Sequence, residues 1–191
     1  MITHYFAPET KGHGVPEVME AMARRGGRIR PRVAIAKVLA SGVCIGTGGS
    51  AGREGPIVQI GSAAGSTIGQ WLRLPSSDIR VLVGCGATAG IAATFNAPLA
   101  GVLFSIELIL LELKTRSFVP LAISSTFATI ISRVFIGTEP MIRVPPYQFR
   151  SPYELVLYLF LGLFAAGIGY IEIVGLYGTC LLYTSPSPRD S

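Results

Sequence analysis

A single carboxylate stands in a run of small residues whose chemistry suits the binding or displacement of an anion. Residues 46–56 read Gly-Thr-Gly-Gly-Ser-Ala-Gly-Arg-Glu-Gly-Pro, and Glu54 is the only acidic residue among them. Pro56 suits the first turn of a helix, and the preceding glycines allow a tight turn or a close approach to a ligand. We therefore predict a helix over residues 56–71 whose free N–H groups attract an anion. Glu54 can take the place of that anion, and a proton or a competing anion can displace it, as in a gate.

A second device of the same kind lies near the start of the chain. Residues 12–14 read Gly-His-Gly, and Pro16 follows at a position typical of a helix start. We predict a short helix over residues 15–23 that also directs its N-terminus at a loop. Glu17 and Glu20 are interpreted as surface carboxylates that complement the dipole of this helix.

The long apolar run 79–113 carries two further polar features. It is interrupted at residues 92–98, where we expect a structural kink in which Asn96 caps the next half-helix. Glu107 follows within an apolar segment, where a carboxylate is costly and is either functional or paired with a neighbouring helix. The structural role is slightly favoured. Glu112 is expected to form a solvated ion pair with its basic neighbours at the membrane edge.

The composition indicates an all-α polytopic membrane protein. Of the 191 residues, 50% are hydrophobic and only 14% are charged. Several apolar stretches are long enough to cross a hydrocarbon core of ~30 Å. The net charge of +5 comes from basic residues that cluster between these stretches without interleaved aromatic residues, so nucleic acid is not an expected partner. The apolar stretches are residues 33–49, 57–72, 79–113, 118–136 and 153–177.

Charge and glycine placement suggest how these stretches are organised. The arginine-rich segment 24–32 and the basic pair at 114–116 are predicted to be cytoplasmic by the positive-inside rule. Residues 33–46 and 56–72 are predicted to make one crossing from two half-helices, and such broken crossings are where membrane proteins bind ions. The three cysteines show no metal or disulfide spacing, so we expect no metal and no cofactor.

The last residues differ in composition from the rest. Residues 180–191 can be back-translated into a transposon adapter used in sequencing libraries, so we expect them to be a non-native tail. Residues 1–179 are then expected to form one partial transmembrane domain.

Three motifs in order give the chain a family resemblance. They are Gly-His-Gly-Val-Pro at 12–16, Gly-Arg-Glu-Gly-Pro at 52–56 and the run from Gly86 to Glu107. With these motifs the chain resembles the CLC family of chloride channels and chloride/proton antiporters. The resemblance covers residues 5 to about 177, roughly the first inverted repeat of that family without its opening helices.

The resemblance implies a function and a set of site residues. In such proteins half-helix N-termini converge on a dehydrated anion near mid-membrane, and Glu54 matches the glutamate that forms the external gate. Chloride is the implied substrate, with other halides, nitrate and protons as further candidates. A homodimer in the lipid bilayer of the cell membrane is implied as well. The anion-binding residues implied are Gly12, His13, Gly14, Val15, Arg53, Glu54, Gly55 and Pro56, with Glu107 as a possible internal acid.

Two positions depart from the family pattern. His13 stands where the family usually has a serine that touches the anion. Its imidazole either donates an N–H to the anion or turns away and leaves binding to backbone N–H groups. Leu108 replaces the second of two glutamates, the internal proton-transfer residue of coupled members. A channel and an exchanger with another proton route both fit this replacement.

Other classes of function make different demands on the same residues. Residues 46–51 match the loose G-x-G-x-x-A fingerprint of dinucleotide-binding enzymes, but a helix rather than a strand is predicted before them. We therefore do not expect an enzyme. A cation transporter would present paired acids and carbonyl ends, whereas here helix N-termini face the breaks. A membrane scaffold that transports nothing is the remaining alternative.

Overall fold

All regular elements in the described part of the chain are helices, as predicted. The computed structural model describes residues 12–111, 115–138, 151 and 153–184. The chain divides into two compact units, Met1–Arg143 and Val144–Ser191, each of which is described by itself. The first unit contains α2 (Val15–Arg24), α3 (Pro31–Gly46), α4 (Glu54–Trp71), α5 (Ser76–Phe95), α6 (Pro98–Phe104), the π-helix η2 (Ser105–Leu110) and α7 (Thr115–Ile136).

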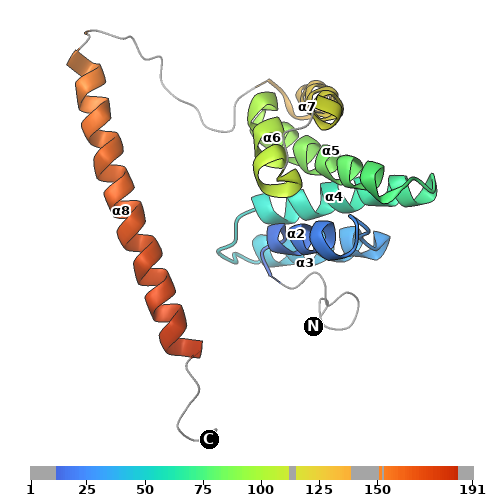
Figure 1. Cartoon of the computed structure of the whole chain (residues 1–191), viewed down its shortest axis with the longest axis horizontal. Coiled ribbons are helices and arrows are strands. Elements are labelled where there is room, and N and C mark those ends of the chain that lie inside the picture. Colours follow the sequence, from blue (N-terminus) through green and yellow to red (C-terminus); the bar gives the residue numbers. More distant parts are fainter. Residues whose placement is uncertain (1–11, 112–114, 139–150, 152, 185–191) are drawn as a thin grey trace, which may run out of the picture. The chain divides into compact units, whose positions relative to one another are not determined.

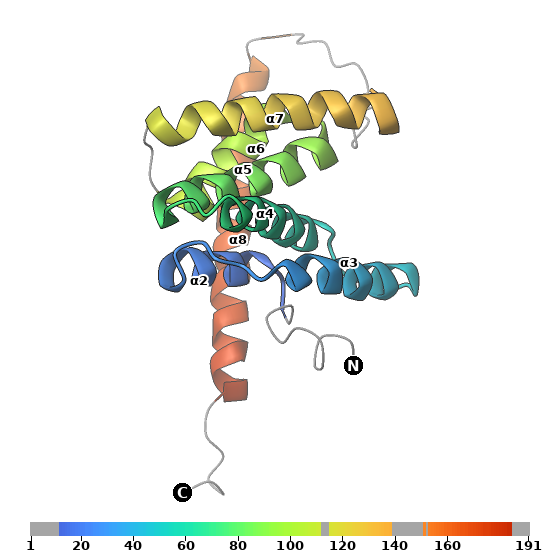
Figure 2. The same cartoon turned by 90° about the vertical axis from the view of Figure 1, so that its right-hand side faces the viewer.

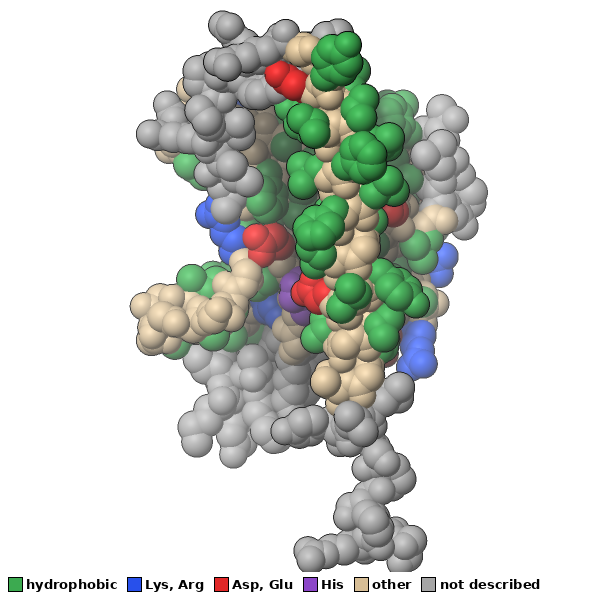
Figure 3. Space-filling model, turned by 90° about the vertical axis from the view of Figure 1, so that its left-hand side faces the viewer, with side chains coloured by type: hydrophobic (Ala, Val, Ile, Leu, Met, Phe, Trp, Pro, Cys, Tyr) green, Lys and Arg blue, Asp and Glu red, His purple; other side chains and the backbone are tan. Residues whose placement is uncertain are grey.

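The second unit contains one long helix, α8 (Tyr153–Thr184). Hydrophobic side chains run along its exposed surface (Figure 3). The helix passes residue 180 without a break, so no helix end marks the boundary expected there. The adapter origin of residues 180–191 stays a prediction.

Among the described residues, three helices are long and apolar enough to cross a membrane, namely Ser76–Phe95, Arg116–Ile136 and Tyr153–Cys180. The 20 residues of α5 extend over about 30 Å, the thickness of a hydrocarbon core. Their length and composition support the prediction of a polytopic membrane protein.

The predicted ion pair of Glu112 with its basic neighbours is not tested, because Glu112 and Lys114 lie outside the described residues. Arg116 forms an ion pair with Asp78 at 3.0 Å.

The helices of the first unit are stacked in chain order. α2 and α3 form one side, α4 lies against them, α5 follows, and α6 and α7 cover the far side of α5 (Figures 1 and 2). α4 and α5 approach closely because glycines face backbone: a methyl group on Gly61 would overlap the Gly86 carbonyl, and one on Gly65 would overlap the Leu82 carbonyl. Small residues therefore set the close packing of α4 against α5.

α3 and α4 lie side by side, so the prediction that they form one crossing end to end is wrong. The Ser66 hydroxyl on α4 donates to the Gly27 carbonyl at 2.6 Å, and Gln70 Nε2 donates to the Ile29 carbonyl at 2.8 Å. These bonds tie the end of α4 to the segment that leads into α3. The loop at residues 47–53 consequently closes a helical hairpin.

The break after α5 is a kink, as predicted, but the prediction for Asn96 is wrong. Asn96 ends α5 in the left-handed conformation with φ 54°, and Ala97 occupies the N-cap of α6. The Asn96 side chain accepts a hydrogen bond from Arg133 Nε at 2.7 Å and donates one to the Thr138 carbonyl at 3.1 Å. Asn96 therefore ends the preceding helix and fastens it to the end of α7.

α5 and α7 run parallel and are joined by serine hydroxyls of α7. Ser124 donates to the Cys85 carbonyl at 2.9 Å, and Ser132 donates to the Ala93 carbonyl at 2.8 Å, each across a separation of 39 residues. The two helices therefore begin at the same end of the unit.

Candidate anion-binding site

The first turn of α4 leaves amide hydrogens without an acceptor inside the helix. α4 begins at Glu54, slightly before the predicted start at Pro56. Its first backbone bond runs from the Ile57 N–H to the Arg53 carbonyl at 3.1 Å. The N–H groups before Ile57 have no place in the helical ladder. Pro56 has no N–H, so it can only shape this turn and cannot donate to an anion.

The Glu54 carboxylate lies beside this helix end. A methyl group on Gly52 would overlap the carboxylate, which is therefore folded back over the Gly52 backbone. Glu54 is half-buried, whereas its neighbour Arg53 is exposed. A negative group in this position is stabilised by the positive end of the helix dipole.

The first turn of α2 is closed by its own carboxylate. Gly12 and Gly14 adopt φ values of 92° and 113°, which few residues other than glycine reach easily. The Gly14 N–H donates to Glu17 Oε2 at 2.8 Å. Glu17 thus complements the helix N-terminus, as predicted, and occupies one of the amides that an anion could have used. Glu20 forms an exposed ion pair with Arg24 at 3.6 Å.

The two glycine motifs meet in space, although 40 residues separate them in the chain. A methyl group on Gly14 would lie 2.5 Å from the Gly55 carbonyl oxygen. One on Gly55 would overlap the His13 carbonyl and lie 2.8 Å from His13 Nδ1. Only glycine fits at both positions, and the His13 ring lies against the start of α4. The structure therefore brings residues 12–15 and 53–56 together.

A buried lysine supports this junction, and the sequence analysis did not single it out. Lys37 on α3 is only 4% exposed, and its Nζ donates to the Gly12 carbonyl at 2.9 Å. The Glu17 carboxylate is close enough to interact electrostatically with Lys37. The signal was present in the sequence, since Lys37 is the only charged residue in the apolar stretch 33–49.

Glu107 does not join this site. It is exposed on η2, and Ile109, two residues further on, lines a cavity together with Arg80 near the start of α5. Glu54 lies toward the opposite end of α5, since Ile57 packs against Gly90. The level of Glu107, near Arg80, and the level of Glu54, near Gly90, are therefore about 10 residues of α5, or roughly 15 Å, apart.

The geometry favours anion chemistry over the other classes considered. The loop at 46–51 follows α3, a helix, so the strand that a dinucleotide fingerprint requires is missing. Helix N-termini rather than carbonyl ends meet at the junction, which suits an anion. Within the described residues no group of three potential metal-binding side chains occurs.

The fold and the junction define an all-helical membrane protein with paired helix N-termini, and comparison with known proteins identifies its family. The model of the voltage gated chloride channel family matches residues 1–186. The chain belongs to this family, the CLC family.

The relatives include a protein named as a chloride channel and several named as exchange transporters. The chain is 38% identical to a putative chloride channel protein, ClcB-like, of Ralstonia nicotianae over 167 residues, which cover 85% of this chain and 39% of the relative. The chain is 37% identical to the H(+)/Cl(-) exchange transporter ClcA of Vibrio cholerae over 196 residues, which cover 99% of this chain and 39% of the relative. It is also 37% identical to ClcA of Vibrio parahaemolyticus over 177 residues, covering 89% of this chain and 37% of the relative. The crystal structure of a slow cyanobacterial Cl-/H+ antiporter matches with a TM-score of 0.81 at 28% identity, covering 98% of this chain and 45% of that one. The chain thus spans about two-fifths of the length of the curated relatives.

Proposed function

We propose that this chain contributes the gate and half of the anion seat of a transporter that moves chloride across the cell membrane. One observation supports the proposal: His13 and Gly14 contact Gly55, so the first turns of α2 and α4 meet, and Glu54 is the first residue of α4. Chloride transport is also what the names of the related proteins state for those proteins.

The proposed seat consists of Gly12, His13, Gly14 and Val15 from one motif and Arg53, Glu54, Gly55 and Pro56 from the other. Backbone N–H groups of both first turns donate to the anion, except the Gly14 N–H, which Glu17 occupies, and the two prolines fix the turns. The His13 ring adds an N–H donor, because it already lies against Gly55. Lys37 holds the Gly12 carbonyl away from the anion and adds positive charge beneath the loop.

In this proposal Glu54 gates the seat by competing with chloride. The ionised carboxylate is attracted to the same helix end as the anion, so the two exclude each other. Protonation removes the negative charge of Glu54 and lets the anion enter.

Glu54→Gln tests the gate. In the full-length protein reconstituted into vesicles, the variant should carry chloride at a rate independent of external pH, because glutamine mimics the protonated carboxylate. The measurement is chloride efflux over a range of external pH. A pH-sensitive dye in the same vesicles distinguishes a proton exchanger, whose proton flux stops in the variant, from a channel, which moves none.

Glu20→Gln is the matched control, because Glu20 lies on α2 in an exposed ion pair away from the seat. It should keep the pH dependence of the parent protein. Persistence of that pH dependence in Glu54→Gln, at normal expression and chloride binding, would remove Glu54 from the gate.

A further inference from the structure

Arginines gather at the end of the first unit that lies opposite Glu54. Five arginines fall between residues 24 and 32, and Arg73, Arg80 and Arg116 lie at the same end. The proximity is direct: a methyl group on Gly27 would lie 3.3 Å from the Arg80 Cα, and Arg116 reaches Asp78 at the start of α5. By the positive-inside rule this basic end faces the cytoplasm.

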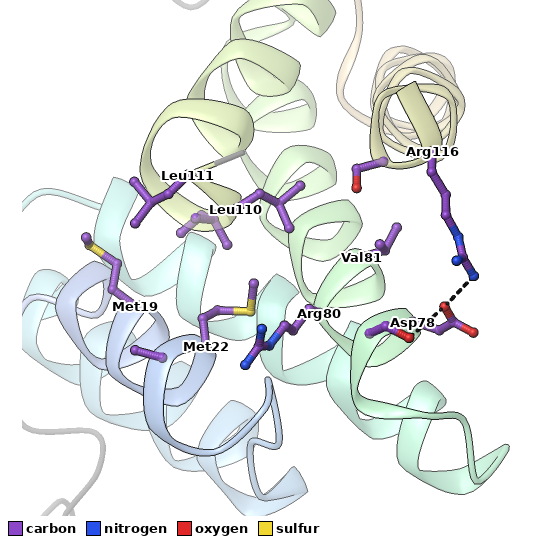
Figure 4. Close-up of a pocket in the computed structure, with 12 residues that line it drawn as sticks. Met19, Met22, Asp78, Arg80, Val81, Leu110, Leu111 and Arg116 are labelled. Atoms are coloured by element: carbon purple, nitrogen blue, oxygen red, sulfur yellow. Dashed lines mark hydrogen bonds and ion pairs between the residues drawn. The ribbon is translucent and has the colours of Figure 1, made fainter. Parts of the chain in front are cut away.

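An open cavity of about 540 Å³ lies at this end between α2, α5, η2 and the start of α7. Figure 4 shows Met19 and Met22 on one side and Leu110 and Leu111 on another. Leu111 is 68% exposed although it is a large apolar side chain. The walls are therefore apolar and accessible.

The rim of the same cavity is cationic. The Arg80 side chain lies beside Met22 (Figure 4), and among the described residues it forms no ion pair. Arg116 pairs with Asp78 at 3.0 Å, but its side chain stays 79% exposed. Counting Asp78, the rim keeps a net positive charge.

We propose that this cavity binds an anionic phospholipid of the cytoplasmic leaflet. Its phosphate contacts Arg80, Arg116 adds positive charge at the rim, and the upper part of an acyl chain lies against Met19, Leu110 and Leu111. α5 is about as long as the hydrocarbon core is thick, so its start lies at the depth of the head groups. Basic pockets between spanning helices on this side suit such head groups. Apolar walls favour an amphiphile over a fully hydrated anion.

The test uses a fluorophore at the rim of the cavity. Ala23 lines the cavity and is exposed on α2. A bimane attached to Ala23→Cys in the full-length protein, with the native cysteines replaced, reports quenching by lipids brominated in the acyl chain. Vesicles contain brominated phosphatidylglycerol or, as the neutral probe, brominated phosphatidylcholine. Phosphatidylglycerol should quench at a much lower mole fraction than phosphatidylcholine.

Arg80→Gln combined with Arg116→Gln should raise the phosphatidylglycerol fraction needed for half-maximal quenching about tenfold or more, since each arginine near a membrane surface strengthens anionic binding. The matched control, Arg24→Gln with Arg32→Gln, removes the same charge from the basic end but not from the cavity. It should change that fraction less than twofold. Leu111→Asn should weaken quenching by both lipids, and asparagine tolerates the φ of 55° at this position.

Four results would overturn the proposal. Equal quenching by both lipids would show ordinary contact with bulk lipid, and an equal loss in the control variant would show only a diffuse surface field. Absence of quenching by either lipid would show that protein fills the cavity. Displacement of phosphatidylglycerol by soluble glycerol phosphate would show a site for a free anion. None of these readouts depends on chloride transport or on Glu54, so the lipid proposal and the gate proposal fail separately.

Discussion

Gly14 and Gly55 carry the contact on which the candidate seat depends. Each faces the backbone of the other motif at a distance that leaves no room for a side chain. The two residues do more than permit a turn, since any substituent pushes one helix N-terminus away from the other. Glycine is therefore needed at both positions to keep the amide N–H groups of the two first turns close to each other.

Gly55→Ala should lower chloride affinity and destabilise the protein. The added methyl group overlaps the His13 carbonyl, and inserting atoms into such a packed contact lowers the free energy of unfolding by about 1–3 kcal/mol. Isothermal titration with chloride and the apparent melting temperature in detergent measure the two effects.

The control for this substitution is Gly42→Ala, because Gly42 lies inside α3 with open space around it. Alanine favours a helix interior by about 1 kcal/mol over glycine, so this variant should melt at the same or a higher temperature. Unchanged chloride binding in Gly55→Ala would show that the contact with His13 is irrelevant to the seat.

Sequence reasoning selected two motifs that meet in the structure, but not all of their neighbours, and the anion seat itself stays a prediction. Glu54 and the glycines around it were recognisable because their types are unusual between apolar segments. Lys37 stands out in the sequence as a charge within an apolar stretch, but only the folded structure shows that it donates to the Gly12 carbonyl. Nor could the sequence place the His13 ring, because its direction depends on how closely Gly55 approaches.

Among the elements, α4 and α5 form the tightest helix pair. Gly61 and Gly65 on α4 face carbonyl oxygens of α5, and Gly86 on α5 faces the Gly61 carbonyl in return. Helices that approach through glycine gain backbone contact that lipid cannot replace.

Gly61→Leu should force α4 and α5 apart and destabilise the protein by about 3 kcal/mol or prevent its folding. Gly162→Leu on α8 makes the same change where the added atoms meet open space, and it should be tolerated. Monodisperse elution and the melting temperature of the two variants give the comparison. Similar behaviour of both would show that the glycine contact is not required.

Helix starts were predicted accurately where proline or glycine alone determines them. Pro16 and the two glycine breaks set helix starts within two residues of the observed ones at Val15 and Glu54. The arrangement of α3 and α4 was missed because apolar pattern and length do not distinguish two half-helices in line from two in a hairpin. Ser66 and Gln70, which tie the hairpin, are polar residues within an apolar helix.

At the scale of the whole molecule, charge predicts orientation. The arginines of residues 24–32 lie at one end of the first unit, and Arg133 with Gly137 lies at the end of α7, a helix long enough to cross the membrane. Arg24→Cys should react with a membrane-impermeant thiol reagent only from the cytoplasm. Gly137→Cys should react only from outside. Both variants are made without native cysteines and labelled in intact cells and inverted vesicles, and the opposite pattern would reverse the proposed orientation.

The serine contacts of α7 have a mechanical consequence. Ser124 and Ser132 both donate to α5 carbonyls that lie 39 residues earlier in the chain. Because the offset is the same, rotation of either helix about its axis would break both hydrogen bonds together. We therefore expect α5 and α7 to move as one body in any rearrangement of the first unit.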